Sequence, residues 1–463
     1  MKTLLMNMPS SISVYGKSKI KAAVAPRPFL SMAELGAAIL ETGNKVEILD
    51  FQLSSNPIQD LVNKINNYKP DMIGLTFTTP LVAEAIKLTK FLREKFPEIK
   101  QIAGGVHPTI MPKSVLENSE IDIVVIGEAD RTVQEIVQGK KLSQIKGIAY
   151  KEKGKIKFTK PRPLIENLDS LPLPAWHLFP VSQYKNPRMM ARKNPVGTIG
   201  TSRGCVFGCI YCNKSVFGRK FRAKSVARVV KEFEHLKKSG FNEVHVWDDM
   251  FSTDLKRAKE ICRVMIKKNL NLTWQLECGV RVNSVDLEFF QLARKAGCYK
   301  VAFGYESGNQ KILDNMNKGI NLQDSENATN LARQAGLEVS GFFMFGLPGE
   351  TIETMEDTIK FACKLNPDMA KVTILVPFPS TPVFDDFKKQ GLIISEDWTK
   401  YNFHTASKVY NHPNLSWEVL EKYYDLFYKR FYFRPNYLIK RFIRSSIRGE
   451  LLYDIYYAIK TFF

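Results

Sequence analysis

The stretch GCVFGCIYCN, residues 204–213, places Cys205, Cys209 and Cys212 in the spacing C-x3-C-x2-C. A structural zinc site usually takes four ligands as two separated pairs, and the other cysteines of this chain form no second pair. A catalytic thiol would need no companion thiols at such short spacing. Soft thiolates also bind iron–sulfur clusters, which usually take four of them. The three cysteines therefore predict a cluster with one iron left open to a small molecule that carries an amine and a carboxylate.

The cysteine run directly follows VGTIGTS, residues 196–202, the first of six apolar runs that are typical of strands. The other five runs occupy residues 242–249, 272–278, 299–307, 337–346 and 369–375. Helical patterns lie between them, for example at 224–238, 284–296 and 351–365. Six such units predict a partial (β/α) barrel, in which chemistry takes place at the C-terminal ends of the strands. The cysteines would then lie on the active face of the barrel.

A second alternation of strands and helices precedes the cysteines. Apolar runs occupy residues 3–9, 45–51, 71–79, 100–105 and 122–128, with helical spacing at 31–43 and 81–97. This order predicts a doubly wound parallel sheet that binds its ligand beyond the carboxyl ends of the strands. A dinucleotide is disfavoured as the ligand because no GxGxxG follows the first strand. The candidate ligand-binding residues at this edge are Thr76, Thr78, Thr79, Gly104, Gly105, Val106, His107, Gly127 and Glu128.

The composition changes near residue 151, where a Lys- and Pro-rich stretch begins with a predicted hairpin around Gly154. We therefore expect a first domain at 1–145, a linker at 146–190, a barrel at 191–384 and a helical region at 385–463. The segment 417–463 interleaves Tyr and Phe with basic residues. Such a segment can pack on the barrel with its basic side chains extended to solvent, or lie on an anionic membrane surface.

The charge, the cysteine count and the apolar runs of the whole chain limit the class of protein. Its 463 residues carry a formal charge of +20, which suits an anionic partner but is also typical of a lysine-rich protein kept soluble by charge. The chain has an odd number of cysteines, seven, and its opening residues show no cleavage site, so we expect reduced thiols and a cytoplasmic protein. No apolar run approaches eighteen residues, so we expect no membrane-spanning helix.

The C-x3-C-x-aromatic-C pattern, with Tyr211 in the aromatic place, resembles the radical S-adenosylmethionine (SAM) superfamily. The resemblance implies a [4Fe–4S] cluster on the three cysteines, with SAM chelating the fourth iron. One electron from the cluster would cleave SAM and give a 5′-deoxyadenosyl radical. The resemblance also implies that SAM contacts residues at the strand ends, with helix capping, surface ion pairing and core packing as the competing roles. The implied SAM-binding residues are Tyr211, Asp248, Asp249, Arg281, Glu306 and Ser307.

The first domain, with GGVHPT at 104–109 and GEAD at 127–130, resembles the cobalamin-binding branch of this superfamily. That branch includes anaerobic magnesium-protoporphyrin ester cyclases, hopanoid-modifying enzymes and enzymes that methylate carbon or phosphorus. The resemblance implies cobalamin at the edge residues given above. The D-x-H-x-x-G motif that supplies a histidine to cobalt in many cobalamin proteins is absent, so we do not expect His107 to be an axial ligand.

These resemblances imply a cobalamin-dependent radical SAM methyltransferase acting on an unactivated carbon of a hydrophobic or lipid-like small molecule. An oxidative cyclase of the magnesium-protoporphyrin ester type is the alternative reaction, with a tetrapyrrole as substrate. A third reading, an RNA-modifying protein, is disfavoured because such relatives carry a further cysteine trio, and no cysteine precedes Cys205. The expected partners are a ferredoxin or flavodoxin as electron donor and, through the tail, the inner face of the membrane. Catalytic residues other than the cysteines stay unassigned.

Overall fold

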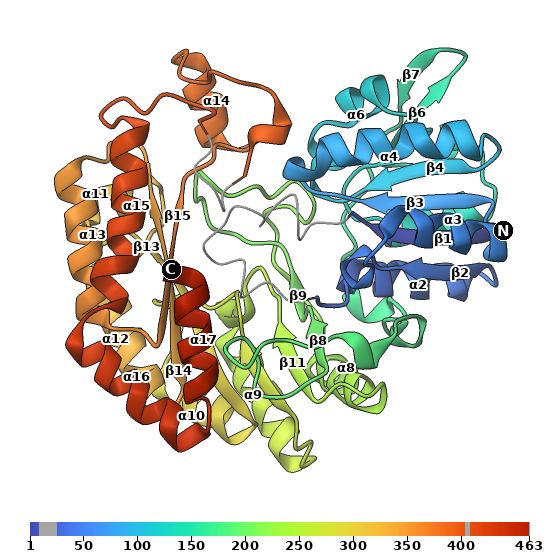
Figure 1. The fold of residues 1–463 in the computed structure, drawn as a ribbon. Coiled ribbons are helices and arrows are strands. Elements are labelled where there is room, and N and C mark those ends of the chain that lie inside the picture. Colours follow the sequence, from blue (N-terminus) through green and yellow to red (C-terminus); the bar gives the residue numbers. More distant parts are fainter. Residues whose placement is uncertain (9–25, 403–407, 463) are drawn as a thin grey trace.

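The first sheet has seven strands in the order β2-β1-β3-β4-β5-β6-β7 (Figure 1). The computed structural model describes residues 1–8, 26–402 and 408–462. The first five strands pair in parallel, as predicted, and β6 and β7 add an antiparallel hairpin. The strands are β1 (Lys2–Asn7), β2 (Lys45–Leu49), β3 (Met72–Thr76), β4 (Lys100–Gly104), β5 (Ile123–Val125), β6 (Ile148–Glu152) and β7 (Lys155–Phe158).

Helices cover both faces of this sheet, which confirms the doubly wound architecture. They are α2 (Leu30–Glu41), α3 (Pro57–Tyr68), α4 (Val82–Lys95), α5 (Val106–Ile110), α6 (Pro112–Asn118) and α7 (Asp130–Val137). The predicted hairpin turns at Lys153 and Gly154, both with positive φ, which suits the twist of the two strands. Because the hairpin pairs with β5, the first sheet continues to Phe158, beyond the boundary at residue 145 that the composition suggested.

The second sheet is an open barrel wall of six parallel strands in the order β15-β14-β13-β12-β11-β8. All six correspond to the apolar runs predicted from the sequence. The strands are β8 (Val196–Ile199), β11 (Glu243–Val246), β12 (Thr273–Leu276), β13 (Cys298–Glu306), β14 (Glu338–Phe345) and β15 (Met369–Ile374). The helices around them are α8 (Val226–Lys238), α9 (Leu255–Lys267), α10 (Leu287–Lys295), α11 (Gln310–Asn315), α12 (Leu322–Gln334), α13 (Ile352–Leu365) and α14 (Pro382–Lys389).

The C-terminal region is helical, as predicted, and its first helix covers the exposed edge of the barrel at β15 (Figure 1). Three helices form the region: α15 (Trp417–Tyr432), α16 (Pro435–Arg448) and α17 (Leu451–Phe462). The Tyr432 hydroxyl lies 3.0 Å from the Ala370 nitrogen and 2.8 Å from the Ala370 oxygen. The Tyr428 hydroxyl bonds the nitrogen and oxygen of Val372 in the same way. Two tyrosines one helical turn apart thus satisfy backbone groups that a further strand would otherwise pair.

One hydrophobic core joins the two domains. Buried side chains of the first sheet and α2 continue through Trp176, Phe179 and Tyr184 of the connecting segment into the barrel helices. A second, smaller core fills the opposite face of the first sheet. No helix of the described residues is both long and apolar enough to cross a membrane. The relative placement of the two sheets is therefore set by a continuous apolar interior.

Candidate active site

The three cysteines lie on a loop held at its base by a two-stranded ribbon, β9 (Ser202–Arg203) and β10 (Arg222–Ala223). Gly204 begins the loop with a φ of 87°, and a Cβ atom there would lie 2.3 Å from the Lys220 oxygen. Only glycine adopts this conformation without strain or collision. The Gly204 nitrogen donates to Asp249, at 2.8 Å, which ties the loop to the end of β11.

The thiols of the loop are free, and they differ in exposure. Cys209 is buried, Cys205 is partly exposed and Cys212 is exposed. Burial raises the pKa of Cys212, and the neighbouring Cys209 and Cys205 raise it further, so the three sulfur atoms share one electrostatic environment. No three His, Cys, Asp or Glu side chains of the described residues converge on a single ion. The donor set suits a cubane cluster, because soft thiolates are the ligands of such clusters and each cysteine of a cubane binds a different iron.

A buried arginine lies beside the cysteine loop. The Arg281 guanidinium stacks on Phe207, 3.7 Å from the ring centroid, and donates to the backbone oxygens of Lys318 and Gly319. Burial lowers the pKa of Arg281, while the neighbouring Cys209 and Cys205 raise it. Arg281 is therefore a cation fixed against the loop, where it opposes the negative charge of thiolates.

Tyr211, the aromatic residue of the cysteine motif, is linked to the end of β13. Its hydroxyl donates to Glu306 at 2.9 Å, and Lys318 donates to the same carboxylate oxygen at 2.7 Å. Glu306 has a positive φ of 64°, an uncommon conformation for a non-glycine residue that is often found at functional sites. Gly304 makes room for this arrangement, since a Cβ there would lie 2.4 Å from the Glu306 carboxylate. The predicted neighbour Ser307 is fully buried and bonds Thr358 instead.

The two aspartates after β11 occupy different environments. Asp248 is buried and accepts hydrogen bonds from the Thr201 nitrogen and hydroxyl, at 2.5 Å each, and from the Ser202 hydroxyl at 2.7 Å. Asp249 is exposed, yet burial of its carboxyl among neighbouring groups raises its pKa. Solvent reaches the Asp249 carboxyl, but the surrounding protein removes part of its hydration, so this carboxyl lies in a recess. Asp249 can thus meet a ligand, whereas Asp248 holds the turn that leads into the cysteine loop.

Polar side chains line the interior of the barrel below the cysteines. Glu277 accepts from Arg27 at 2.5 Å and from the Trp247 indole at 2.8 Å, and it contacts His245 at 3.0 Å. Burial alone would raise the pKa of Glu277, but Arg27 and His245 hold it well below its usual value. The Trp247 ring is nevertheless 41% exposed. The lumen therefore contains an engaged carboxylate beside an accessible aromatic surface.

The predicted cobalamin-binding residues gather at one edge of the first sheet, because β3, β4 and β5 are neighbours and end together. Gly105 has a φ of 96°, and a Cβ there would lie 2.6 Å from the Thr76 hydroxyl. His107 is fully buried; its Nδ1 lies 3.1 Å from Thr79, and its Nε2 has no partner among the described residues. Burial lowers the pKa of His107 to about 4. The accessible members of the set are Thr76, Thr78, Gly104, Gly105, Val106 and Gly127.

Glu128, also predicted at this edge, takes part in a buried ion cluster between the domains. Its carboxylate accepts from Arg222 at 2.9 Å and from Arg203 at 3.2 Å. Arg203 also bonds Asp130 at 2.9 Å and Glu34 at 3.0 Å. Burial by itself lowers the pKa of Arg203, but the surrounding carboxylates raise it overall. Because Arg203 and Arg222 form the base of the cysteine loop, the cluster fastens that loop to the edge of the first sheet.

Several residues of the site are not predicted by the sequence patterns. Lys318 lies in no motif, and its role depends on the turn after α11. Arg203 and Arg222 are nineteen residues apart and meet Glu128 only after folding. Glu277 begins ECGVRVN, the stretch at 277–283 in which Arg281 is the residue predicted to bind SAM. Its position near the end of the predicted strand at 272–278 is the one available signal for its role.

Comparisons with known proteins agree with this geometry. The model of the radical SAM superfamily matches residues 199–362, and that of the B12 binding domain matches residues 30–137. An uncharacterized methyltransferase of Pyrococcus horikoshii, PH0819, is 34% identical over 99% of both chains. The anaerobic magnesium-protoporphyrin IX monomethyl ester cyclase of Rubrivivax gelatinosus is 30% identical, over 90% of this chain and 76% of its own.

A solved structure shares the whole architecture. The radical SAM methyltransferase TsrM of Kitasatospora setae, solved with cobalamin and a [4Fe–4S] cluster, superposes with a TM-score of 0.73. The match covers 94% of this chain and 89% of that one at 19% identity, so the likeness concerns the fold. The fold and the cysteine loop define a radical SAM barrel joined to a B12-binding domain. The chain belongs to the cobalamin-binding branch of the radical SAM superfamily, a family of enzymes whose cofactors are a [4Fe–4S] cluster, SAM and cobalamin.

Proposed function

We propose that this enzyme is a methyltransferase that acts on an unactivated carbon of a small molecule. When bound, the cluster and SAM supply a carbon-centred radical, and cobalamin supplies a methyl group. Cys205, Cys209 and Cys212 would hold the cluster. Among the candidate SAM residues, Asp249 is accessible and suits an ammonium group, while Glu306 and Tyr211 lie at the end of β13.

The observation that carries this proposal is the contact between the cysteine loop and the edge of the first sheet. A Cβ at Gly127 would lie 3.8 Å from the Val216 oxygen, and the ion pairs of Glu128 hold the two segments together. A cofactor over Gly104, Gly105 and Gly127 would thus face the same space as a cluster on the cysteines. Methyl transfer needs this proximity, because the radical and the methyl group must meet on one substrate.

The test uses protein purified and reconstituted without oxygen. We expect about four irons and one cobalt per chain, and formation of 5′-deoxyadenosine from SAM on addition of dithionite. Cys205→Ala should lose both the iron and the SAM cleavage, whereas Cys363→Ala, far along the chain from the loop, is the matched control. Zinc in place of iron, or a Cys205→Ala protein that keeps its cluster, would contradict the proposal.

The cyclase reaction is the second candidate, and the 30% identity to the Rubrivivax gelatinosus cyclase favours it. Incubation with methyl-labelled SAM and a candidate substrate, such as a lipid or a tetrapyrrole, separates the two reactions. Label in the product supports methyl transfer, and an oxidised product without label supports ring closure. A reduced ferredoxin or flavodoxin is the proposed physiological donor, which should replace dithionite in the same assay.

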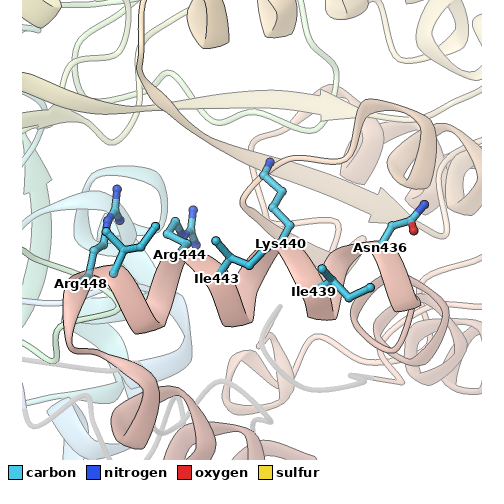
Figure 2. A pocket seen from close by; sticks show the side chains of 7 residues that line it. Asn436, Ile439, Lys440, Ile443, Arg444 and Arg448 are labelled. Atoms are coloured by element: carbon cyan, nitrogen blue, oxygen red, sulfur yellow. The ribbon is translucent and has the colours of Figure 1, made fainter.

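We further propose that α16 and α17 attach the enzyme to an anionic membrane surface. Figure 2 shows one face of α16, where isoleucines alternate with basic residues around a shallow recess. The basic side chains of this face also pair with Asp368 and Glu338 of the barrel. Large apolar side chains here are about half exposed or more, which is unusual for a surface that contacts only water. They are Leu438, Ile439, Phe442, Ile443, Ile447, Leu452, Tyr453, Ile455, Tyr456 and Ile459. Basic side chains beside an apolar stripe suit anionic lipid headgroups.

Cosedimentation with vesicles tests this attachment. We expect binding to vesicles that contain phosphatidylglycerol, weaker binding to pure phosphatidylcholine, and loss of binding in Ile439→Glu/Ile447→Glu. Ile58→Glu, at a comparably exposed isoleucine of α3, is the matched control. Equal binding by both variants would contradict the proposal. A dimer in light scattering that the double variant dissociates would instead assign the surface to a second copy of the chain.

A further inference from the structure

Two lysines face the interior of the barrel. Lys300 of β13 lies in register with Gln275 of β12, which lies in register with His245 of β11. The side chains of Gln275 and His245 bond one another inside the barrel. Lys371 of β15 lies in register with Phe342 of β14. The residues that flank Lys371, Ala370 and Val372, are fully buried in the hydrophobic core on the outer side. Strand alternation therefore directs both lysines into the lumen.

Neither ammonium group has an acceptor among the described residues. No hydrogen bond or ion pair of either side-chain ammonium group is present in that part of the chain. The Lys300 nitrogen lies 5.8 Å from the ring centroid of Tyr299, and the Lys371 nitrogen lies 6.0 Å from that of Phe342. Lys300 is only 8% exposed. Neither nitrogen is among the fully enclosed polar atoms that lack partners, so neither is sealed off from solvent. A buried ammonium group without an acceptor is stabilised when it binds an anionic partner.

The carboxylates nearby are already engaged. Glu277 is held by Arg27, His245 and Trp247, and Glu243 by His245 and Tyr299. Glu338 binds Arg192 and, at 2.7 Å, Arg448 on the outer rim. Glu338, Glu277 and Glu243 oppose the lowering of the Lys300 pKa by burial, but none of the three forms an ion pair with either lysine. Burial lowers the pKa of Lys371 to about 8, with Lys300 and Arg27 acting in the same direction and Glu277 against it.

The surroundings of the lysines are partly apolar. Phe342, whose ring centroid is 6.0 Å from the Lys371 nitrogen, and Met344 are half-buried on the inward side of β14. Trp247 offers an accessible ring on the opposite wall, beside Glu277. Such surroundings suit a molecule with an apolar body and a charged end, since large apolar area and a few polar groups define small-molecule sites.

We propose that the barrel lumen is the substrate site and that Lys300 and Lys371 bind a carboxylate or phosphate group of an anionic substrate. The inference rests on the proposed function, because it names the substrate class of that active site. The two lysines are binding residues, and the anion they hold would orient the apolar body toward the cysteine loop. The reaction class that supplies such a substrate is one that leaves a free carboxylate or a phosphate ester.

Labelling with pyridoxal 5′-phosphate tests the site without any substrate. Its aldehyde condenses with a lysine amine, with loss of water, and borohydride reduces the imine to a stable adduct that mass spectrometry locates. On the reconstituted full chain at pH 7.5 we expect Lys371 to be labelled at least about tenfold faster than exposed Lys113, because the phosphate of the reagent would bind the proposed anion site and burial lowers the pKa of Lys371 to about 8. Inorganic phosphate should protect Lys371, and uncharged pyridoxal should label it more slowly.

Three further arms make the outcome decisive. Protection by phosphate but not by succinate assigns the site to phosphate esters, and the reverse assigns it to carboxylates. Lys300→Met should weaken the protection of Lys371 by anions, whereas Lys113→Met should leave it intact. Labelling of Lys371 no faster than Lys113, or labelling insensitive to both anions, would overturn the inference. SAM cleavage by the unlabelled wild-type protein is measured separately, so failure of the methyltransferase proposal stays distinct from failure of the anion site.

Discussion

At the scale of single residues, Gly204 controls the shape of the cysteine loop. It combines a positive φ with a contact that leaves no room for a side chain, and its nitrogen is fixed to Asp249. Gly154 shares the positive φ, but a Cβ added there would meet no atom within 4 Å. Alanine at position 154 would therefore introduce backbone strain alone, whereas alanine at position 204 would add a steric collision.

Gly204→Ala should reduce cluster binding as well as stability. A left-handed backbone costs an alanine about 1 kcal/mol, and the collision with Lys220 adds displacement of the loop. The measurement is iron per chain after anaerobic reconstitution, together with urea unfolding. Gly154→Ala should lose roughly 1 kcal/mol and keep its iron. Normal iron content in Gly204→Ala would show that the loop tolerates the displacement.

Glu350 gives a pH dependence that can be measured. It is fully buried, accepts from the nitrogens of Gly346 and Leu347, and burial raises its pKa to about 8. The folded state therefore holds this proton more tightly than the unfolded state between roughly pH 4.5 and pH 8. In that pH range the contribution of the Glu350 carboxyl to the free energy of unfolding falls as the pH rises.

Glu350→Gln should remove this contribution and keep an oxygen for the two donors. We expect its free energy of unfolding to match the wild type near pH 4.5 and to exceed it increasingly up to pH 8. Urea unfolding at several pH values, compared between the two proteins, gives the difference. A difference that is constant with pH would mean that Glu350 does not change its protonation on unfolding.

At the scale of elements, α15 replaces a missing neighbour of the edge strand β15. The hydroxyls of Tyr428 and Tyr432 each serve both a backbone nitrogen and a backbone oxygen. Tyr437 continues the row by donating to the Asp368 oxygen at 2.9 Å. A helix thus protects an open barrel edge that would otherwise be free to pair with another strand.

Tyr428→Phe and Tyr432→Phe should each lower the free energy of unfolding by about 1–3 kcal/mol, because each leaves buried backbone groups unpaired. The aromatic packing of the rings is retained, so the loss reports the hydroxyl alone. Tyr453→Phe, on the exposed side of α17, is the control and should change little. Equal stability of all three variants would show that water satisfies the edge of β15.

At the scale of the whole molecule, the two domains are joined by apolar packing and by charges that are almost completely buried. The side chains of Glu128 and Arg222 are each 2% exposed. Trp398, in the segment after the barrel, also packs against His107 at the edge of the first sheet. The arrangement of the two cofactor sites therefore depends on contacts between parts of the chain that are distant in sequence.

Glu128→Gln should cost about 3 kcal/mol, because Arg203 and Arg222 lose a buried carboxylate. The loss should weaken the contact between the domains, which calorimetry would detect as a lower transition temperature and limited proteolysis as faster cleavage between residues 159 and 195. Glu166→Gln removes an exposed pair with Lys220 and should cost at most about 1 kcal/mol. A single transition at the wild-type temperature in Glu128→Gln would contradict this account.

Local sequence accounts for the helices and strands, and it predicts the cluster ligands. Strands and helices follow from local periodicity, and the cysteine motif lies within eight consecutive residues, so neither needs long-range information. Roles that depend on one side chain meeting another were harder to predict. Asp248, Asp249 and Glu128 are all carboxylates near strand ends, yet the fold exposes Asp249 and buries the other two.

Which polar groups are engaged by other side chains, and which are left for ligands, depends on how distant parts of the chain pack together. Glu128 meets arginines more than seventy residues away, and Lys300 and Lys371 reach one lumen from two different strands. Burial removes a charge from water and makes its interactions stronger, so a buried charge needs a partner. Which charges are buried is a property of the assembled fold. Local pattern places a charged residue at a strand, and packing then determines whether its partner is another side chain or a ligand.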